Sequence, residues 1–133
     1  MKLLLATHGN FAEGILQSYE MIAGDTSNIS TVLLNELGIE DFQTRLHQTL
    51  DQLLATDEVL ILVDLPGGTP YNESLAYQLE HPKGLGVISG LNLPMLIEVG
   101  MGLSNSSLDE LKQTALEFGQ NGIQSTDDIL GDL

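Results

Sequence analysis

The sequence predicts an α/β fold: a doubly wound, mostly parallel four-stranded sheet with helices on both faces. Short apolar runs alternate with longer amphipathic stretches along the 133 residues, and this alternation is typical of parallel strands joined by helical crossovers. Residues 58–64, EVLILVD, form a continuous apolar run, which indicates a strand covered on both faces. No internal repeat or low-complexity linker divides the chain, so one domain with a single core is expected.

The first half of the chain is expected to form two strands and two helices. Residues 2–7, KLLLAT, predict a buried strand, and residues 29–35, ISTVLLN, predict a second one. The helix between them is expected to begin at a capping box of Asn10 and Glu13 and to end at Gly24. Its apolar residues recur at helical spacing: Phe11, Ile15, Tyr19 and Ile22. The second helix, residues 39–54, has an equivalent stripe: Phe42, Leu46, Leu50 and Leu53.

The second half is expected to add two strands, 58–64 and 85–90, and three helices. Cap residues and prolines mark the helix starts: Thr69 as an N-cap before Pro70, Asn92 before Leu93 and Pro94, and Ser107 with Glu110 as a capping box. The last residues, 123–133, are expected to hold a short edge strand and an acidic tail.

The net charge of the chain limits the classes of partner that it can bind. Nineteen Asp and Glu face only four Lys and Arg, for a formal net charge of −15, so nucleic acid and anionic membrane surfaces are poor partners and a basic protein surface is a better one. The absence of cysteine excludes disulfides and thiolate chemistry. The N-terminal apolar run is too short for an export signal, so a cytoplasmic protein is expected.

Candidate chemistry lies where the strands end. Ligands of such sheets bind beyond the carboxyl ends of the strands, and His8 and Asp64 each close a buried strand there. If these strands are neighbours, Asp64 can accept a hydrogen bond from one imidazole nitrogen and leave the other free to attack or to accept a proton. A plainer interpretation stays open, in which His8 is structural and Asp64 caps a turn.

A glycine-rich turn follows Asp64. Gly67 and Gly68 allow a ligand to approach the backbone, and the helix that begins at Thr69 and Pro70 presents free N–H groups suited to an anion. A histidine nucleophile beside such a cradle suggests phosphoryl transfer through phosphohistidine. Alternatively, both glycines serve the turn alone. His47 is expected to face solvent and His81 to lie in a loop.

Other mechanisms fit less well. The chain has neither G-x-x-x-x-G-K-[ST] nor G-x-G-x-x-G after a strand, so the usual nucleotide-binding loops are absent. The three histidines are far apart in sequence and show no zinc pattern. No metal site and no cofactor are therefore expected.

Three segments in this order, ATHGNFAEGILQSYEMIAG, LVDLPGGTPYNES and GLNLPMLIE, resemble the enzyme IIA domain of the mannose family of the bacterial phosphoenolpyruvate-dependent sugar phosphotransferase system. The resemblance covers residues 1–124 and leaves 125–133 as the acidic tail. It implies that His8 accepts phosphate from the phosphocarrier protein HPr and passes it to a IIB component, with Asp64 orienting the ring. It implies a phosphate site formed by nearby residues: Gly9, Gly67, Gly68, Thr69, Asn72 and Asn92.

The resemblance also implies a homodimer that can exchange a C-terminal strand, and indirect association with membrane IIC and IID components. The sequence does not name the sugar. Three alternatives stay open: a phosphotransfer subunit of a dihydroxyacetone kinase, a regulatory module controlled by phosphorylated His8, and a binding module in which His8 is only structural. The docking face is expected to be ringed by apolar and acidic groups that meet basic patches on HPr.

Overall fold

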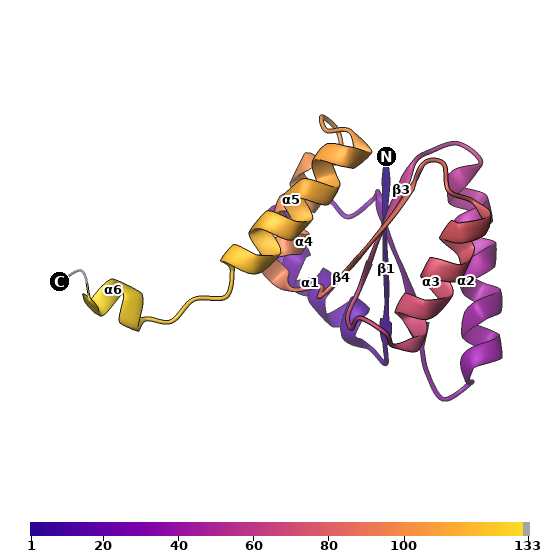
Figure 1. Cartoon of the computed structure of the whole chain (residues 1–133), viewed down its shortest axis with the longest axis horizontal. Coiled ribbons are helices and arrows are strands. Elements are labelled where there is room, and N and C mark those ends of the chain that lie inside the picture. Colours follow the sequence, from indigo (N-terminus) through magenta and orange to yellow (C-terminus); the bar gives the residue numbers. More distant parts are fainter. Residues whose placement is uncertain (132–133) are drawn as a thin grey trace.

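The computed structural model describes residues 1–131, and its centre is a four-stranded parallel sheet in the order β2-β1-β3-β4 (Figure 1). The strands are β1 (Lys2–His8), β2 (Ile29–Leu34), β3 (Val59–Val63) and β4 (Leu85–Ser89). The helices are α1 (Phe11–Ala23), α2 (Ile39–Leu54), α3 (Thr69–Glu80), α4 (Leu93–Gly102), α5 (Leu108–Asn121) and α6 (Asp127–Gly131). The predicted fold class is confirmed, and each predicted strand and helix of residues 1–121 is present.

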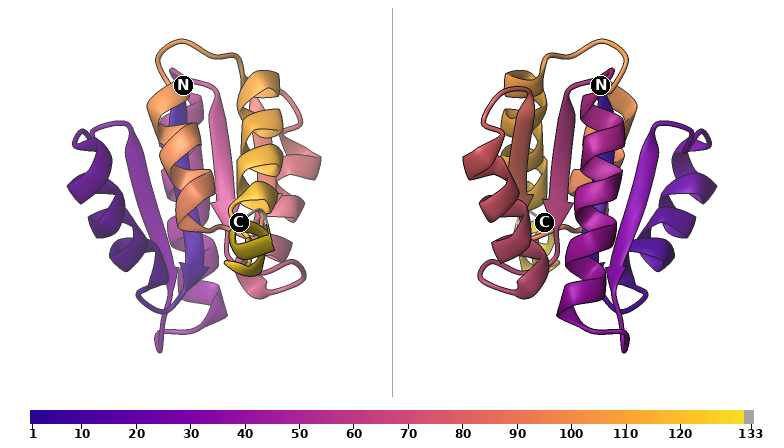
Figure 2. Two further views of the ribbon diagram at one scale, coloured as in Figure 1. Left: turned by 90° about the vertical axis from the view of Figure 1, so that its left-hand side faces the viewer. Right: turned by 90° about the vertical axis from the view of Figure 1, so that its right-hand side faces the viewer.

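The helices cover both faces of the sheet. Helices α1, α4 and α5 pack on one face and α2 and α3 on the other, as the two views of Figure 2 show in turn. Successive residues of a strand point to opposite faces. Leu3 and Leu5 of β1 therefore join the core under α1, α4 and α5, whereas Leu4 and Ala6 join the core under α2 and α3. The apolar run of β3 is buried along its whole length, as predicted for a strand between two helical layers.

The apolar stripe predicted for the first helix is partly wrong. Ile15 and Tyr19 are buried, but Phe11 and Ile22 are exposed. Ala12 instead faces the sheet at the start of α1 and is buried there. Its side chain is small enough to sit against the strands at that point. Phe11 is left on the surface at the carboxyl edge of the sheet.

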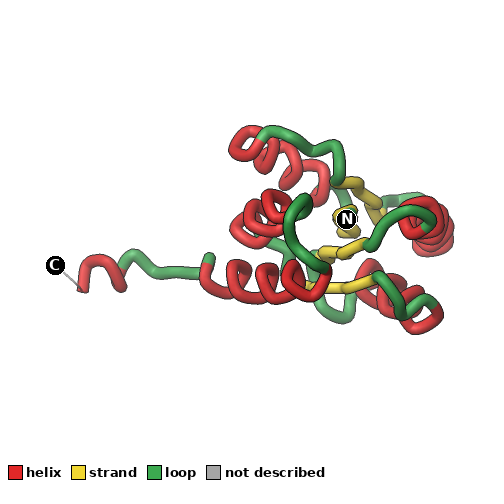
Figure 3. The backbone as a smooth tube through the Cα atoms, turned by 90° about the horizontal axis from the view of Figure 1, so that it is seen from above, coloured by secondary structure: helices red, strands yellow, loops and turns green. Residues whose placement is uncertain are grey.

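The C-terminal segment does not form the predicted edge strand in this single chain. Residues 121–131 are exposed, and the described end of the segment is the short helix α6, which stands away from the body of the domain in Figures 1 and 3. Two aspartates in its first turn, Asp127 and Asp128, favour a helix start there. Strand exchange across a dimer stays a prediction, and Asp132 and Leu133 of the predicted tail lie outside the described residues.

Two of the predicted helix caps are as expected and two are not. Asn92 accepts a hydrogen bond from the Met95 N–H, and Ser107 and Glu110 form the predicted capping box. Asn10 makes no capping bond with its side chain, and Gly68 rather than Thr69 is the N-cap of α3. Within residues 1–131, no helix is both long enough and apolar enough to cross a membrane.

Candidate functional site

His8 and Asp64 meet at the carboxyl edge of the sheet, as the sequence predicts. Strands β1 and β3 are hydrogen-bonded neighbours, with Ala6 opposite Val63, so the residues that follow lie side by side. One carboxylate oxygen of Asp64, Oδ2, accepts two hydrogen bonds from His8: one from its backbone N–H at 2.9 Å and one from the ring nitrogen Nδ1 at 2.8 Å. Asp64 thus holds both the backbone and the imidazole of the same residue.

This arrangement selects one tautomer of His8. The carboxylate of Asp64 is an acceptor throughout, because its second oxygen, Oδ1, accepts the Leu65 N–H at 3.0 Å. Nδ1 of His8 therefore carries the hydrogen, and in the neutral ring Nε2 keeps its lone pair. The His8 side chain is 43% exposed and that of Asp64 is 11% exposed. The carboxylate is enclosed, whereas the ring is open to a large reaction partner.

The turn after His8 is fixed from two sides. Gly9 has a φ of +54°, in the left-handed region that favours glycine, and its N–H donates to the Leu34 carbonyl at 2.7 Å. The Thr7 hydroxyl oxygen accepts the Ala12 N–H at 2.9 Å, and Thr7 is fully buried. Thr7 therefore replaces Asn10 as the side-chain cap of α1. Its hydroxyl within an apolar strand was the signal that the sequence offered for this role.

The glycine turn after Asp64 lies directly against the imidazole. A Cβ atom on Gly68 would come within 2.8 Å of His8 Cε1 and 3.4 Å of Nε2, so only glycine fits beside this ring. Gly67 has a φ of +79°, and its carbonyl accepts a hydrogen bond from the Asn72 side-chain amide at 3.0 Å. Asn72 thereby holds the turn in its unusual conformation.

The first turn of α3 presents backbone donors near this ring. No side chain caps the helix at Gly68, and Thr69 is its first residue. An uncapped N-terminus carries free N–H groups and the positive end of the helix dipole, both of which favour an anion. The predicted cradle of Gly67, Gly68 and Thr69 is therefore brought to the edge where His8 lies.

Asn92 differs from the other predicted site residues in its contacts. Its Oδ1 accepts the Met95 N–H at 3.0 Å, and its Nδ2 donates to the Gly119 carbonyl at 2.9 Å. The side chain thus caps α4 and ties it to α5. These bonds account for Asn92 without a ligand.

Residues 2–116 of the chain match the model of the EIIA-man family, described as "PTS system fructose IIA component". The fructose-specific EIIA component of Bacillus subtilis is 31% identical over 93% of this chain and 85% of its own length. The mannose-specific EIIAB component of Escherichia coli K12 is 33% identical over 92% of this chain, which spans only 38% of that relative. The crystal structure of phosphotransferase system component EIIA from Streptococcus agalactiae has a TM-score of 0.85 at 32% identity, covering 96% of this chain and 98% of its own.

Proposed function

The chain belongs to the EIIA-man family of phosphotransferase-system IIA components, and we propose that it carries a phosphoryl group on Nε2 of His8 between two protein partners. The membership supports a phosphotransfer role in a sugar phosphotransferase system. The observation that carries the finer proposal is the 2.8 Å hydrogen bond between His8 Nδ1 and Asp64 Oδ2. It leaves Nε2 as the one ring nitrogen with a lone pair available for phosphorus.

The proposed step exchanges one N–P bond for another. Nε2 of His8 attacks the phosphorus of a phosphohistidine on HPr, the donor's N–P bond breaks, and the donor imidazole keeps the electron pair. No proton has to be removed from His8, because the single N–H of the neutral ring is on Nδ1 and Nε2 carries none. Reversal of the same step on a IIB component returns the ring to its starting state. The hydrogen bond to Asp64 stabilises the positive charge that develops on the imidazole during attack.

The phosphoryl oxygens need donors, and the backbone can supply them. Gly68 lies against the His8 ring, and the uncapped first turn of α3 follows it. Preorganised N–H groups of this kind stabilise the charge of a loose phosphoryl-transfer transition state. We infer that Gly9, Gly67, Gly68 and Thr69 surround the phosphoryl group, and that Asn72 acts by holding the Gly67 carbonyl. Asn92 is left out of this proposal, because its amide already bonds to α4 and α5.

The surface around His8 suits a protein donor with a basic rim. Four apolar side chains from the segments at or near this end of the sheet are exposed: Phe11, Leu37, Ile39 and Leu65. Glu13 and Glu36 are neighbours of these residues in the chain. Apolar contacts with acidic groups among them fit a partner that carries the opposite charge. The IIB component is expected to use the same surface, because it must reach the same nitrogen.

We further infer from the family that the chain works as a homodimer in the cytoplasm and meets the membrane IIC and IID components only through IIB. In this proposal residues 1–124 are the IIA domain. The family does not identify the sugar, because its members differ: the Bacillus subtilis relative is fructose-specific and the Escherichia coli one is mannose-specific.

The test is the intact mass after incubation with phosphoenolpyruvate, enzyme I and HPr. The unaltered chain is expected to gain one acid-labile phosphoryl group, and His8→Ala is expected to gain none. His47→Gln is the matched control, because it removes a different histidine that lies on α2. Subsequent addition of a IIB component should remove the label.

Two results would overturn the proposal. One is the absence of any mass gain when the HPr in the same tube is shown to be phosphorylated and comes from the matching organism. The other is a label that persists in His8→Ala, which would place the phosphoryl group on another residue.

A further inference from the structure

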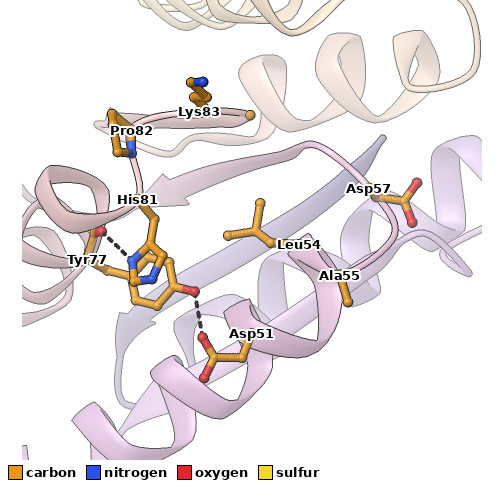
Figure 4. A pocket seen from close by; sticks show the side chains of 9 residues that line it. Asp51, Leu54, Ala55, Asp57, Tyr77, His81, Pro82 and Lys83 are labelled. Carbon is orange, nitrogen blue, oxygen red and sulfur yellow. Dashed lines mark hydrogen bonds between the residues drawn. The ribbon is translucent and has the colours of Figure 1, made fainter.

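A hollow lies at the amino end of the sheet, opposite to His8. It has a volume of about 640 Å³ and is lined by the end of α2, the end of α3 and the loop that leads into β4 (Figure 4). Strands β3 and β4 begin beside it, at Val59 and Leu85. Five residues of β3 rise about 16 Å, so this cavity is separate from the His8 site. Its volume falls in the range of small-molecule sites.

The floor of the cavity is a cluster around the buried Tyr77, in which Asp51 and His81 are exposed to solvent. The Tyr77 hydroxyl donates to Asp51 Oδ1 at 2.6 Å, and the His81 ring stacks on the phenol ring with centroids 4.2 Å apart. His47 packs against the same phenol edge-on at 5.4 Å, and it is half-buried rather than solvent-facing as the sequence had suggested. Burial, followed by the hydrogen bond and charge of Asp51, raises the pKa of Tyr77 to about 12, so its hydroxyl keeps its hydrogen at ordinary pH.

The polar groups of this floor that lack a partner are acceptors. Asp51 uses Oδ1 for Tyr77, and its Oδ2 makes no hydrogen bond within residues 1–131. His81 Nδ1 lies 3.2 Å from the Tyr77 carbonyl. A carbonyl only accepts, so Nδ1 carries the hydrogen and Nε2 of the neutral ring is a second free acceptor. An occupant must therefore donate hydrogen bonds to this floor.

The helix ends add negative potential. Helices α2 and α3 both end at the cavity, and neither has a basic residue in its last turn. The carboxyl end of a helix carries a partial negative charge, so two of them beside Asp51 favour a cation. Asp57 contributes little to this field, because its oxygens bond to the N-terminal amine and the Thr56 hydroxyl.

The walls of the cavity are apolar, and its rim holds one cation. Leu54, Ala55 and Pro82 supply carbon surface beside the acceptors. Lys83 lies at the opposite rim in Figure 4 with its ammonium directed away from Asp51. Unlike the other three basic side chains, Lys83 makes no hydrogen bond or ion pair with any described residue. The floor is thus left with the charge of Asp51.

We propose that this cavity binds a small organic amine, with its ammonium group on Asp51 Oδ2 and His81 Nε2 and its carbon body on Leu54, Ala55 and Pro82. A metal ion is not the occupant that the donors favour, because the part of the chain that the structure describes has no group of three His, Asp or Glu arranged to hold one. The cavity and its ligand are independent of the phosphoryl group on His8.

Three probe molecules of similar size and different charge test whether this cavity prefers a cation. n-Butylammonium is expected to shift the ring resonances of Tyr77 and His81 saturably in an NMR titration of the full chain. n-Butanol and butyrate at the same concentrations are expected to leave them in place, because neither brings a positive charge to Asp51. The same titration of His8→Ala should be unchanged, which separates this proposal from the phosphotransfer proposal.

Two variants give effects of opposite direction. Asp51→Asn keeps an oxygen for the Tyr77 hydroxyl and removes the charge, so butylammonium should bind about five- to tenfold more weakly. Lys83→Met removes the like charge at the rim, so binding should be unchanged or tighter by about two- to threefold. Unchanged chemical shifts of the core methyl groups would show that both variants keep the fold.

Three outcomes overturn the proposal. One is saturable binding of butyrate that is lost in Lys83→Met, which would make the cavity an anion site. The second is no saturable shift with any of the three probes. The third is butylammonium binding that is indifferent to Asp51→Asn, which would remove the assigned contact.

Discussion

The two ends of the sheet hold a histidine in different ways. At the carboxyl end, His8 is held by a carboxylate at Nδ1, and its ring is partly open, with the backbone of Gly68 close against it. At the amino end, His81 is held by stacking on a buried tyrosine and by a carbonyl of its own helix, beside a cavity of about 640 Å³. The first arrangement leaves an oriented ring nitrogen open to solvent, and the second makes the imidazole part of the floor of a cavity.

This difference matches the two kinds of function proposed for the two ends. A phosphoryl group that passes from one protein surface to another needs an exposed nucleophile on a shallow face, because both partners must reach it. A small molecule that is only bound needs a hollow with apolar walls and a few polar groups. Under the two proposals, orientation of His8 by a charged acceptor and the hollow beside the buried Tyr77 would meet these two needs separately.

Asp64→Asn is expected to have the largest effect at the carboxyl end. An amide can donate to Nδ1 and stabilise the tautomer with hydrogen on Nε2, and it brings no charge to the developing imidazolium. The rate of phosphorylation by HPr should fall by about 10²- to 10³-fold. Initial rates from quenched intact-mass time courses measure this. A rate within about fivefold of the unaltered chain would show that Asp64 has only a structural role. His8 and His81 would then not differ in the way proposed, since neither would be oriented for reaction by a charged group.

Gly68→Ala is expected to have the next largest effect. Its Cβ would meet His8 Cε1 at 2.8 Å, so the ring must turn away from its position, and transfer should fall by about 10²-fold. The same time course measures the loss. Gly14→Ala is the matched control: its Cβ meets nothing within 4 Å in α1, and it should stabilise the fold by about 0.5–1 kcal/mol. Equal rates in the two variants would contradict the packing of Gly68 on His8.

Asn92→Ala tests whether Asn92 belongs to the site at the carboxyl end of the sheet. Loss of the α4 cap should lower the free energy of unfolding by about 1 kcal/mol, as measured by urea denaturation. Because the amide of Asn92 bonds to Met95 and Gly119, the transfer rate of the folded variant should stay close to that of the unaltered chain. A loss of transfer without a loss of stability would return Asn92 to the phosphate site.

Tyr77→Phe probes the amino end, and its expected effect on stability is similar to that of Asn92→Ala. The pKa of Tyr77 is raised from 10.0 to about 12, so its neutral form stabilises the fold fully below pH 10, and this contribution is lost as the pH rises from 10 to 12. Removing the hydroxyl should cost about 0.5–1.5 kcal/mol at neutral pH. Urea denaturation of both chains up to pH 11 should show the difference narrowing above pH 10. Tyr71→Phe is the control, and a difference that is constant with pH would contradict the raised pKa.

The helix-cap predictions that held rest on local signals. Asn92 and the pair Ser107 and Glu110 bond within four residues, so their spacing alone identifies the caps. Asn10 and Glu13 have the same spacing but form no such box: the backbone of Asn10, with φ −90° and ψ 13°, is not extended like that of Asn92 and Ser107, and Thr7 of β1 accepts the Ala12 N–H instead. The cap of α1 depends on a strand side chain that no helix pattern includes.

The predicted C-terminal edge strand shows a second limit. A strand is stabilised by the neighbour with which it pairs, and an edge segment has to find that neighbour in the tertiary or quaternary structure. In the single chain, residues 127–131 form a helix instead. The apolar Met21 and Met101 are exposed for a related reason: an apolar residue type does not by itself say which side of a helix faces the sheet.

The sequence by itself determined the succession of strands and helices along the chain, the two-sided burial of β3, and the residue types at the carboxyl edge of the sheet. It could do so because periodicity, caps and turn glycines act over a few residues. Only the tertiary structure decided that one oxygen of Asp64 holds both the backbone and the ring of His8, 56 residues away. It alone placed Gly68 on the imidazole and brought His47 and His81 to Tyr77. These contacts depend on strand order and register, which are set when both faces of the sheet are buried at once.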